Sequence, residues 1–260
     1  MAKGGSAEAA PAAAPPVGGP AAAVDPQLVA LALRQHPRII LGTGSSSRRG
    51  IMDELAAEYG FSYEVAKADI DEKAIRHEDA RHLVLRLAHA KAAAIAAKLA
   101  AAEGAPPSGL LITCDQVVLH EGQILEKPED EAQARQYIAG YARAPASTVG
   151  SVVLTDLTTG RSWEGVDVAE IHFDPISQES VDKLVAEGEV FWCAGGLMVE
   201  HSLVQPHVTR MDGALDSVMG LDKRLLLRLL CAVAADASGG RGDGGGGDGD
   251  DRSRGEGPSS

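Results

Sequence analysis

Cysteine is scarce in this sequence, which has three cysteines among 260 residues and no Cys-x-x-Cys pair. Cys114, Cys193 and Cys231 are odd in number and widely spaced, which fits a reducing compartment and argues against a structural zinc site. The histidines show neither His-x-x-x-His nor His-Glu-x-x-His spacing, so they receive no ligand role. We therefore interpret the cysteines as part of the scaffold.

Long hydrophobic runs and an excess of positive charge are also lacking. No apolar run reaches membrane-spanning length, and the N-terminus has no apolar signal-peptide core. The net charge of −13 argues against a broad nucleic-acid-binding face, although it leaves room for a local cationic pocket. We expect no membrane partner, no nucleic-acid partner and a cytoplasmic location; organelle targeting by the N-terminal leader is the alternative.

The two ends of the chain lack the residues that build a core. Residues 1 to about 26 are mostly Ala, Pro and Gly, and residues 236–260 are rich in Gly, Asp, Arg and Ser. Roughly 200 residues lie between them, enough for one sizeable core. We expect a largely disordered leader over residues 1–36, one folded domain over residues 37–235 and a disordered tail over residues 236–260.

Hydrophobic patterns typical of strands and of helices are mixed along this central part. Strands are predicted at residues 39–41, 62–67, 110–113, 117–120, 123–125, 149–156, 161–173 and 208–211. Helices are predicted at residues 48–59, 77–102, 130–138, 177–187 and 221–233. Hairpins and crossovers both occur, so the expected fold is an α/β domain with a mixed, twisted sheet.

The loop after the first strand favours binding of an anion. Small residues fill positions 42–47, and Arg48 and Arg49 open the following helix. Free amide groups and the helix dipole favour an anion there, and the two guanidinium groups add forked donors. Neither the Walker spacing nor the dinucleotide fingerprint is present. The alternative is an ordinary polar loop with surface arginines.

Three more residues carry suggestive chemistry. Lys91 lies near the apolar face of an alanine-rich helix, Asp115 ends a buried strand, and Lys127 precedes a proline. Taken singly, each has a commoner use: Lys91 as a snorkelling lysine, Lys127 as a solvated loop cation, and Asp115 as a turn or cap residue. Taken together with the two arginines, they suggest a polyphosphate pocket that contains an acid or base.

Other acidic residues are candidates for metal binding or for the scaffold. Asp71 and Glu72 offer oxygens of the kind that Mg²⁺ prefers alongside phosphates, although a solvated acidic loop is the simpler interpretation. Residues 167–170 are interpreted as part of the scaffold.

Seven segments occur in the order found in one known family. They are residues 41–49, 68–72, 85–91, 113–117, 126–128, 193–196 with Glu200, and 218–221. In these segments the chain resembles Maf-like proteins, which are nucleoside triphosphate pyrophosphatases, over about residues 38–233. The resemblance implies a fold related to the inosine triphosphate pyrophosphatases: an elongated mixed sheet flanked by helices, with a central cleft. It also implies that NTP and water give NMP and pyrophosphate.

The resemblance implies roles for individual residues. Asp115 matches the proton acceptor, and it and Glu72 match the positions that hold a divalent metal, Mg²⁺ or alternatively Mn²⁺ or Co²⁺. The positions that match phosphate contacts are Thr43, Arg48, Arg49, Lys91 and Lys127. Dimers are common in the family, so a homodimer is also expected.

Three positions bear on which nucleotide base the site would prefer. Gln116 and Glu200 resemble the 7-methyl-GTP subgroup, whereas Ser47 stands where that subgroup often has Trp, and Ser46 replaces the proline of many members. We expect 7-methyl-GTP hydrolysis. The alternatives are a dTTP-, UTP- or CTP-preferring pyrophosphatase of the same family, and a non-catalytic nucleotide-binding regulator of cell division.

Overall fold

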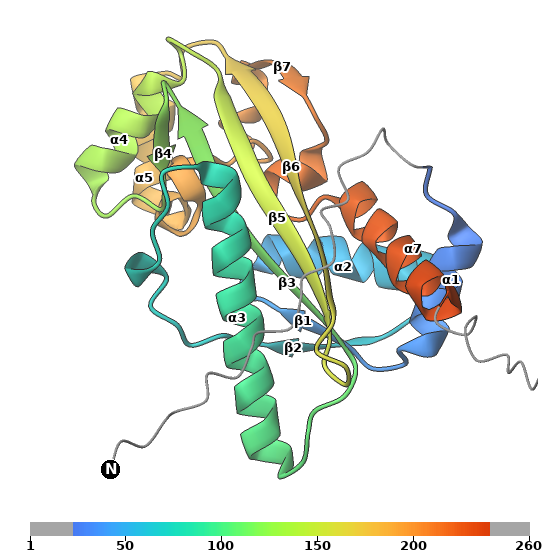
Figure 1. Cartoon of the computed structure of the whole chain (residues 1–260). Helices are drawn as coiled ribbons and strands as arrows, with labels where there is room; N and C mark the ends of the chain where they lie inside the picture. Colours follow the sequence, from blue (N-terminus) through green and yellow to red (C-terminus); the bar gives the residue numbers. More distant parts are fainter. Residues whose placement is uncertain (1–22, 240–260) are drawn as a thin grey trace, which may run out of the picture.

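The computed structural model describes residues 23–239, in which helices cover both faces of a single sheet (Figure 1). The strands are β1 (Ile39–Gly42), β2 (Tyr63–Ala66), β3 (Leu110–His120), β4 (Gln123–Leu125), β5 (Ala146–Asp156), β6 (Ser162–Phe173) and β7 (Val208–Asp212). The α-helices are α1 (Pro26–Gln35), α2 (Ser46–Tyr59), α3 (Ala80–Glu103), α4 (Glu131–Gly140), α5 (Gln178–Glu187), α6 (Leu215–Val218) and α7 (Lys223–Gly239). Short 3₁₀ helices cover Glu72–Ala74, Glu189–Trp192, Ala194–Gly196 and Gln205–His207.

The sheet is mixed, as the sequence predicted. Its strand order is β2-β1-β3-β5-β6-β7, and β4 pairs with β3 outside this path. The pairs β1–β2 and β1–β3 are parallel, whereas β3–β5, β5–β6 and β6–β7 are antiparallel. The expected α/β class with a mixed sheet flanked by helices is thereby confirmed; the expected central cleft stays a prediction.

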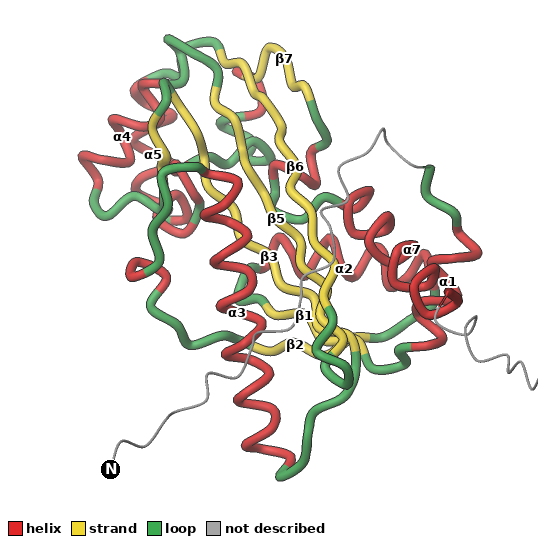
Figure 2. The backbone as a smooth tube through the Cα atoms, viewed as in Figure 1, coloured by secondary structure: helices red, strands yellow, loops and turns green. Residues whose placement is uncertain are grey.

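The helices α2 and α3 lie on opposite faces of the sheet (Figure 2). Met52 and Leu55 of α2 pack in one core cluster with Ile112 of β3, whereas Ile95 of α3 packs in another with Leu111. The neighbouring strands β1 and β3 are thus connected to helices on different faces of the sheet: α2 follows β1 on one face, and α3 precedes β3 on the other. In open α/β sheets, ligands bind beyond the carboxyl ends of the strands at such a switch point.

Local sequence signals explain where these two helices begin and end. The Ser45 hydroxyl caps α2 by accepting from the amide of Arg48, and Gly60 ends the helix with a φ of 69°. Asp79 caps α3 in the same way, and Gly104 ends it with a φ of 65°. Glycine adopts a positive φ without steric cost, so each of these two helices ends at its glycine.

The third strand is longer than the sequence predicted. Residues 110–113 were expected to end the strand just before Asp115, but β3 continues to His120 and Asp115 lies within it. The reason is that β5 pairs with β3 along nearly its whole length, from Leu110 to Leu119. Asp115 is therefore a strand residue paired with Ser151, and its alternative interpretation as a turn or cap residue is wrong.

Both predicted domain boundaries need correction. Residues 26–35, assigned to a disordered leader, form α1, which lies beside α7 (Figure 1). Residue 236, assigned to the tail, lies inside α7, where Asp236 accepts from Trp163 Nε1 at 2.6 Å and pairs with Arg161 at 2.7 Å. The rest of the predicted leader and tail, residues 1–22 and 240–260, lies outside the described residues. All three cysteines are free.

No helix within residues 23–239 combines the length and the apolar composition that a membrane crossing requires.

The packing of α1 can be tested with one truncation. Val29 is 0% exposed in the cluster shared with α7, so Val29→Ala should lower the free energy of unfolding by about 1–2 kcal/mol. Gln27→Ala, an exposed change on the same helix, is the matched control and should change it by less than about 0.5 kcal/mol. Urea unfolding measures both, and equal effects would show that α1 does not contribute to the core.

Candidate active site

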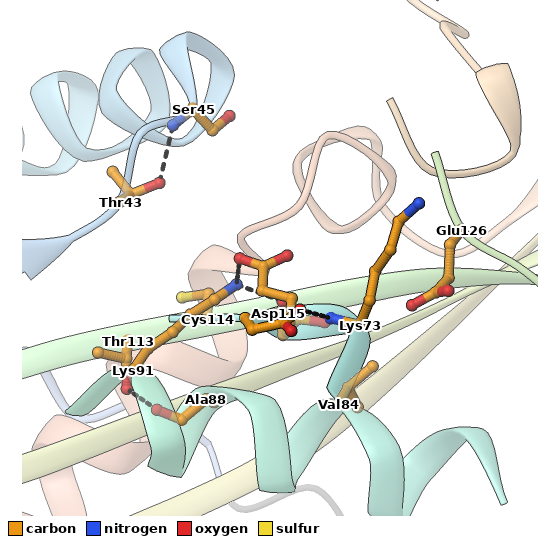
Figure 3. A network of polar contacts seen from close by, with 12 residues as sticks. Thr43, Ser45, Lys73, Val84, Ala88, Lys91, Thr113, Cys114, Asp115 and Glu126 are labelled. Carbon is orange, nitrogen blue, oxygen red and sulfur yellow. Dashed lines mark hydrogen bonds and ion pairs between the residues drawn. The ribbon is translucent and has the colours of Figure 1, made fainter. Parts of the chain in front are cut away.

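A buried lysine joins two carboxylates at the centre of the candidate site. Lys91 of α3 is 9% exposed, and its Nζ lies 3.0 Å from Glu72 Oε1. The same ammonium group donates to Oδ1 of Asp115 on β3, and Asp115 is 6% exposed. Figure 3 shows Lys91 reaching from its helix to Asp115. The fold thus brings together three residues that are distant in the sequence.

Two hydroxyl groups of the sheet hold α3 where Lys91 can reach Asp115. Thr113 Oγ1 donates to the carbonyl of Ala88 at 2.9 Å, and Ser151 Oγ donates to the carbonyl of Val84 at 2.9 Å. Both hydroxyls are buried beside Asp115, since Thr113 is two residues before it and Ser151 is its partner on β5. These bonds fix the helix about one and about two turns before Lys91.

The two carboxylates differ in their electrostatic environment. Burial raises the pKa of Asp115, and the nearby charges of Lys91 and Arg48 only partly offset that effect. Burial also raises the pKa of Glu72, but Lys91, Lys127 and Arg48 outweigh it, so its pKa is below the usual value. The difference follows from solvent access, because the Glu72 side chain is 44% exposed.

The first turn of α2 is built to present amide groups. Thr43, which is buried after β1, accepts from the amide of Ser45 at 3.0 Å (Figure 3). Ser45 Oγ accepts from the amide of Arg48 at 3.3 Å. These two bonds fix the turn that leads from β1 into the helix. The amide of Arg49 donates to the carbonyl of Ser45. The amides of Ser46 and Ser47 and the helix dipole are therefore what this turn offers to an anion.

Arg48 connects three segments of the chain through hydrogen bonds to backbone carbonyls. Its Nε donates to the carbonyl of Gly220 at 2.8 Å, and its Nη1 donates to the carbonyl of Cys114 at 3.2 Å. Two nitrogens of the guanidinium group are therefore used by the backbone. Arg48 thus links α2 to β3 and to the segment between α6 and α7, besides bringing positive charge near Asp115.

Gln116 lies on the other face of β3 from Asp115, because successive strand residues point to opposite sides. Its Nε2 donates to the carbonyl of Ser217 in α6 at 2.8 Å. A backbone carbonyl only accepts, so this bond places the amide nitrogen toward Ser217 and leaves Oε1 beside Gly220.

The four remaining predicted residues are less tightly placed. Ser47 is half-buried on the first turn of α2. Arg49 lies two residues later, and its carbonyl accepts from the Tyr63 hydroxyl at 3.2 Å. Lys127 and Glu200 are both exposed. The charge of Lys127 lowers the pKa of Glu72, so it lies near the central cluster.

Glu200 is connected to the site less directly. Burial raises the pKa of Cys193 to about 11, and the charge of Glu200 adds to the increase while that of Lys127 opposes it. Both residues therefore act on Cys193. Among residues 23–239, no hydrogen bond or ion pair joins Glu200 to Asp115 or Gln116. Its role in base selection stays a prediction.

Two acidic residues make contacts that the sequence did not indicate. Asp71, considered as a source of metal oxygens, accepts from the amide of Lys73 at 3.1 Å and caps the short helix at Glu72–Ala74. Asp167, interpreted as scaffold, accepts from the hydroxyl of Ser217 beside the site. The sequence did not indicate the contact between Ser217 and Asp167, because that contact depends on strand pairing that no local pattern reveals.

Glu72 and Asp115 fit a divalent cation. Lys91 takes one oxygen of each carboxylate, so the second oxygen of each is available, and Glu72 reaches solvent. Mg²⁺ is commonly held by one or two carboxylates together with substrate phosphates. The cationic residues around the cluster supply the matching environment for those phosphates.

Comparison with known proteins shows which family this chain belongs to. A family model described as Maf-like protein matches residues 38–233. A 7-methyl-GTP pyrophosphatase of Dictyostelium discoideum is 37% identical over 197 residues, which cover 75% of this chain and 97% of that protein. A nucleoside triphosphate pyrophosphatase of Salinispora tropica is 31% identical over 202 residues, 78% of this chain and 86% of that protein. A dTTP/UTP pyrophosphatase of Salinibacter ruber is 28% identical over 198 residues, 76% of this chain and 92% of that protein.

The burial of Asp167 predicts a pH-dependent stability. Burial, aided by Asp222 and Asp216, raises its pKa from 3.8 to about 6. Its folded form therefore holds the proton more tightly than its unfolded form, so the stability it contributes is present below pH 3.8 and lost as the pH rises through about 6. Asp167→Asn removes this titration, and its free energy of unfolding relative to wild type should rise by about 1–3 kcal/mol between pH 4 and 7.

Urea unfolding of both proteins across that range measures the difference. A constant offset between them would show that Asp167 titrates like an exposed carboxyl.

Proposed function

We propose that this chain, which belongs to the Maf-like protein family and is a nucleoside triphosphate pyrophosphatase, acts preferentially on 7-methyl-GTP. The proposed reaction converts the triphosphate and water into the nucleoside monophosphate and pyrophosphate. Such a reaction needs an activated water, neutralisation of phosphate charge and stabilisation of the leaving group.

The observation that carries this proposal is the buried Asp115–Lys91 pair with Glu72 beside it. Asp115 is 6% exposed and lies among cations. A carboxylate repels phosphates, so Asp115 contributes little to phosphate binding. Its position is instead suited to handling a proton. The neighbouring first turn of α2 and the charges of Arg48 and Lys127 supply the phosphate-binding environment.

We assign the proton transfer to Asp115. The oxygen of water forms a bond to the α-phosphorus while the bond from that phosphorus to the oxygen bridging to the β-phosphate breaks. The water proton passes to Oδ2 of Asp115, because Oδ1 is bound to Lys91. Burial raises the pKa of this carboxyl, which makes it a better base than an exposed aspartate.

Cations neutralise the charge that develops on the phosphates. Lys91, Arg48, Arg49 and Lys127 are the residues that we assign to this role. A divalent cation bound through Glu72 next to Asp115, Mg²⁺ or alternatively Mn²⁺ or Co²⁺, would add charge neutralisation and lower the pKa of a bound water, while Oδ2 of Asp115 stays free to accept the proton.

The preference for 7-methyl-GTP is proposed from Glu200 and Gln116. An ionised glutamate only accepts hydrogen bonds, so it suits the N1–H and exocyclic amino group of a guanine edge. Methylation at N7 places positive charge on the ring, which favours a carboxylate further. Gln116 both donates and accepts, and its amide is already oriented by Ser217.

Preference for a pyrimidine triphosphate is the second candidate. Ser47 cannot stack on a cationic purine as an aromatic residue would, and this favours dTTP, UTP or CTP. A relative that is 28% identical is a dTTP/UTP pyrophosphatase, so both preferences occur among similar proteins.

A panel of nucleoside triphosphates tests the proposal. Purified protein with Mg²⁺ is given 7-methyl-GTP, GTP, ATP, CTP, UTP and dTTP, and released pyrophosphate and orthophosphate are measured separately. We expect pyrophosphate, with 7-methyl-GTP cleaved best and ATP little. Efficient cleavage of dTTP and UTP with intact 7-methyl-GTP would overturn the base preference, and binding without any turnover would favour a non-catalytic regulator of cell division.

Loss of the proton acceptor should separate binding from turnover. Asp115→Asn keeps the shape of the side chain but removes the base, so kcat should fall by about 10²-fold or more. The melting temperature and the Kd for a non-hydrolysable triphosphate analogue report folding and binding and should change little. Near-normal kcat in the folded variant would remove Asp115 from this role.

The base preference has its own variant. Glu200→Gln removes the negative charge and should lower kcat/KM for 7-methyl-GTP about ten-fold more than for UTP. Glu189→Gln is the matched control, because Glu189 is another exposed carboxylate whose charge acts on Cys193. Equal losses on the two substrates, or equal effects of the two variants, would argue against base recognition by Glu200.

A further inference from the structure

A row of three residues crosses the sheet behind the candidate site. Gln116 on β3 pairs with Gly150 on β5, and Gly150 pairs with Asp167 on β6. Residues in one row project to the same face of a sheet. A Cβ on Gly150 would lie 2.9 Å from Asp167 Oδ1, so the missing side chain leaves the space into which the Asp167 carboxylate leans.

Ser217 connects the two polar ends of this row. It is 2% exposed, its hydroxyl donates to Asp167 Oδ2, and its carbonyl accepts from Gln116 Nε2 at 2.8 Å. Three residues later, the carbonyl of Gly220 accepts from Arg48 Nε at 2.8 Å. The segment of residues 215–221 therefore contacts both a predicted base-reading residue and a predicted phosphate-binding residue.

We propose that Asp167 is a positioning residue that, through Ser217, holds residues 215–221 against the sheet and so orients the Gln116 amide and the Arg48 guanidinium group. This inference rests on the proposed function for the meaning of those two residues, but the contacts themselves do not depend on it. Asp167 itself lies outside the reacting cluster, so it would act on base recognition more than on the proton transfer.

The charges around Asp167 support a specific role. Among residues 23–239, no cation pairs with it, and Asp216 and Asp222 are its charged neighbours. An ionised carboxylate that is buried beside other carboxylates lowers the stability of the folded protein. Such a destabilising group is more usual at a functional site than in the scaffold. At neutral pH an ionised Asp167 only accepts, so the Ser217 hydroxyl must donate to it, and this fixes the serine in one orientation.

Four variants test the link. Asp167→Ala and Ser217→Ala each remove one side of the hydrogen bond, and each should raise KM and lower kcat/KM for 7-methyl-GTP relative to UTP by about three- to ten-fold. Asp167→Asn keeps an acceptor for the serine hydroxyl and should recover most of this loss. Glu170→Gln is the matched control, since Glu170 lies on the same strand but contacts His172, and it should leave the ratio unchanged.

A double variant distinguishes a shared pathway from two separate effects. If Asp167 acts through Ser217, the variant that carries both alanine substitutions should lose no more than either single variant. Additive losses would overturn the proposal, as would equal losses in Asp167→Ala and Glu170→Gln.

The side-chain amide of Gln116 gives a readout that does not need activity. In ¹⁵N-labelled protein, exchange of its Nε2 protons with water should be slow in wild type and at least ten-fold faster in Asp167→Ala and Ser217→Ala. Unchanged exchange in both variants would overturn the positioning role even if nucleotides are hydrolysed. Faster exchange in a protein that hydrolyses no nucleotide would uphold the link and overturn the proposed function instead.

Discussion

The site depends on one ammonium group and one carboxylate that are buried against each other, Lys91 and Asp115. Removing one partner of such a pair typically costs about 3–5 kcal/mol, because the other charge is left buried and uncompensated. The hydroxyls of Thr113 and Ser151 hold the helix that carries the lysine, so the pair has a fixed geometry. Glu72 shares the same lysine but reaches solvent, and it is therefore the carboxylate that a cation can approach first.

The topology of the sheet explains why this pair lies at the same end of the parallel strands as the N-terminus of α2. The parallel strand β1 ends at Gly42 opposite Thr113, while β3 continues to Asp115 and beyond. The chain leaving β1 enters α2 on one face, and α3 covers the other. Gly42 permits the close approach, since a Cβ there would lie 2.7 Å from both Ile95 Cδ1 and Thr113 Cγ2. The N-terminus of α2, which we propose to bind phosphate, and the Lys91–Asp115 pair thus lie at the same end of strands β1 and β3.

Much of this arrangement could be predicted from local patterns, because the signals are local. The cap at Ser177, the glycine stop at Gly60 and the mixed sheet follow from short stretches of sequence. The strand position of Asp115 could not be predicted, since it depends on pairing with Ser151, 36 residues later. The contact of Asp167 with Ser217 needs two strand registers and an α-helical turn to coincide. The contacts that hold the site together depend on pairing between distant segments, and local sequence patterns do not reveal such pairing.

The central claim is that water attacks the α-phosphorus beside Asp115, and the fate of the water oxygen tests it most directly. Hydrolysis of 7-methyl-GTP in ¹⁸O-labelled water is followed by mass spectrometry of both products. Attack at the α-phosphorus predicts one ¹⁸O atom in the nucleoside monophosphate and none in pyrophosphate. Label found in pyrophosphate, or in orthophosphate, would place the attack at another phosphorus and contradict the account.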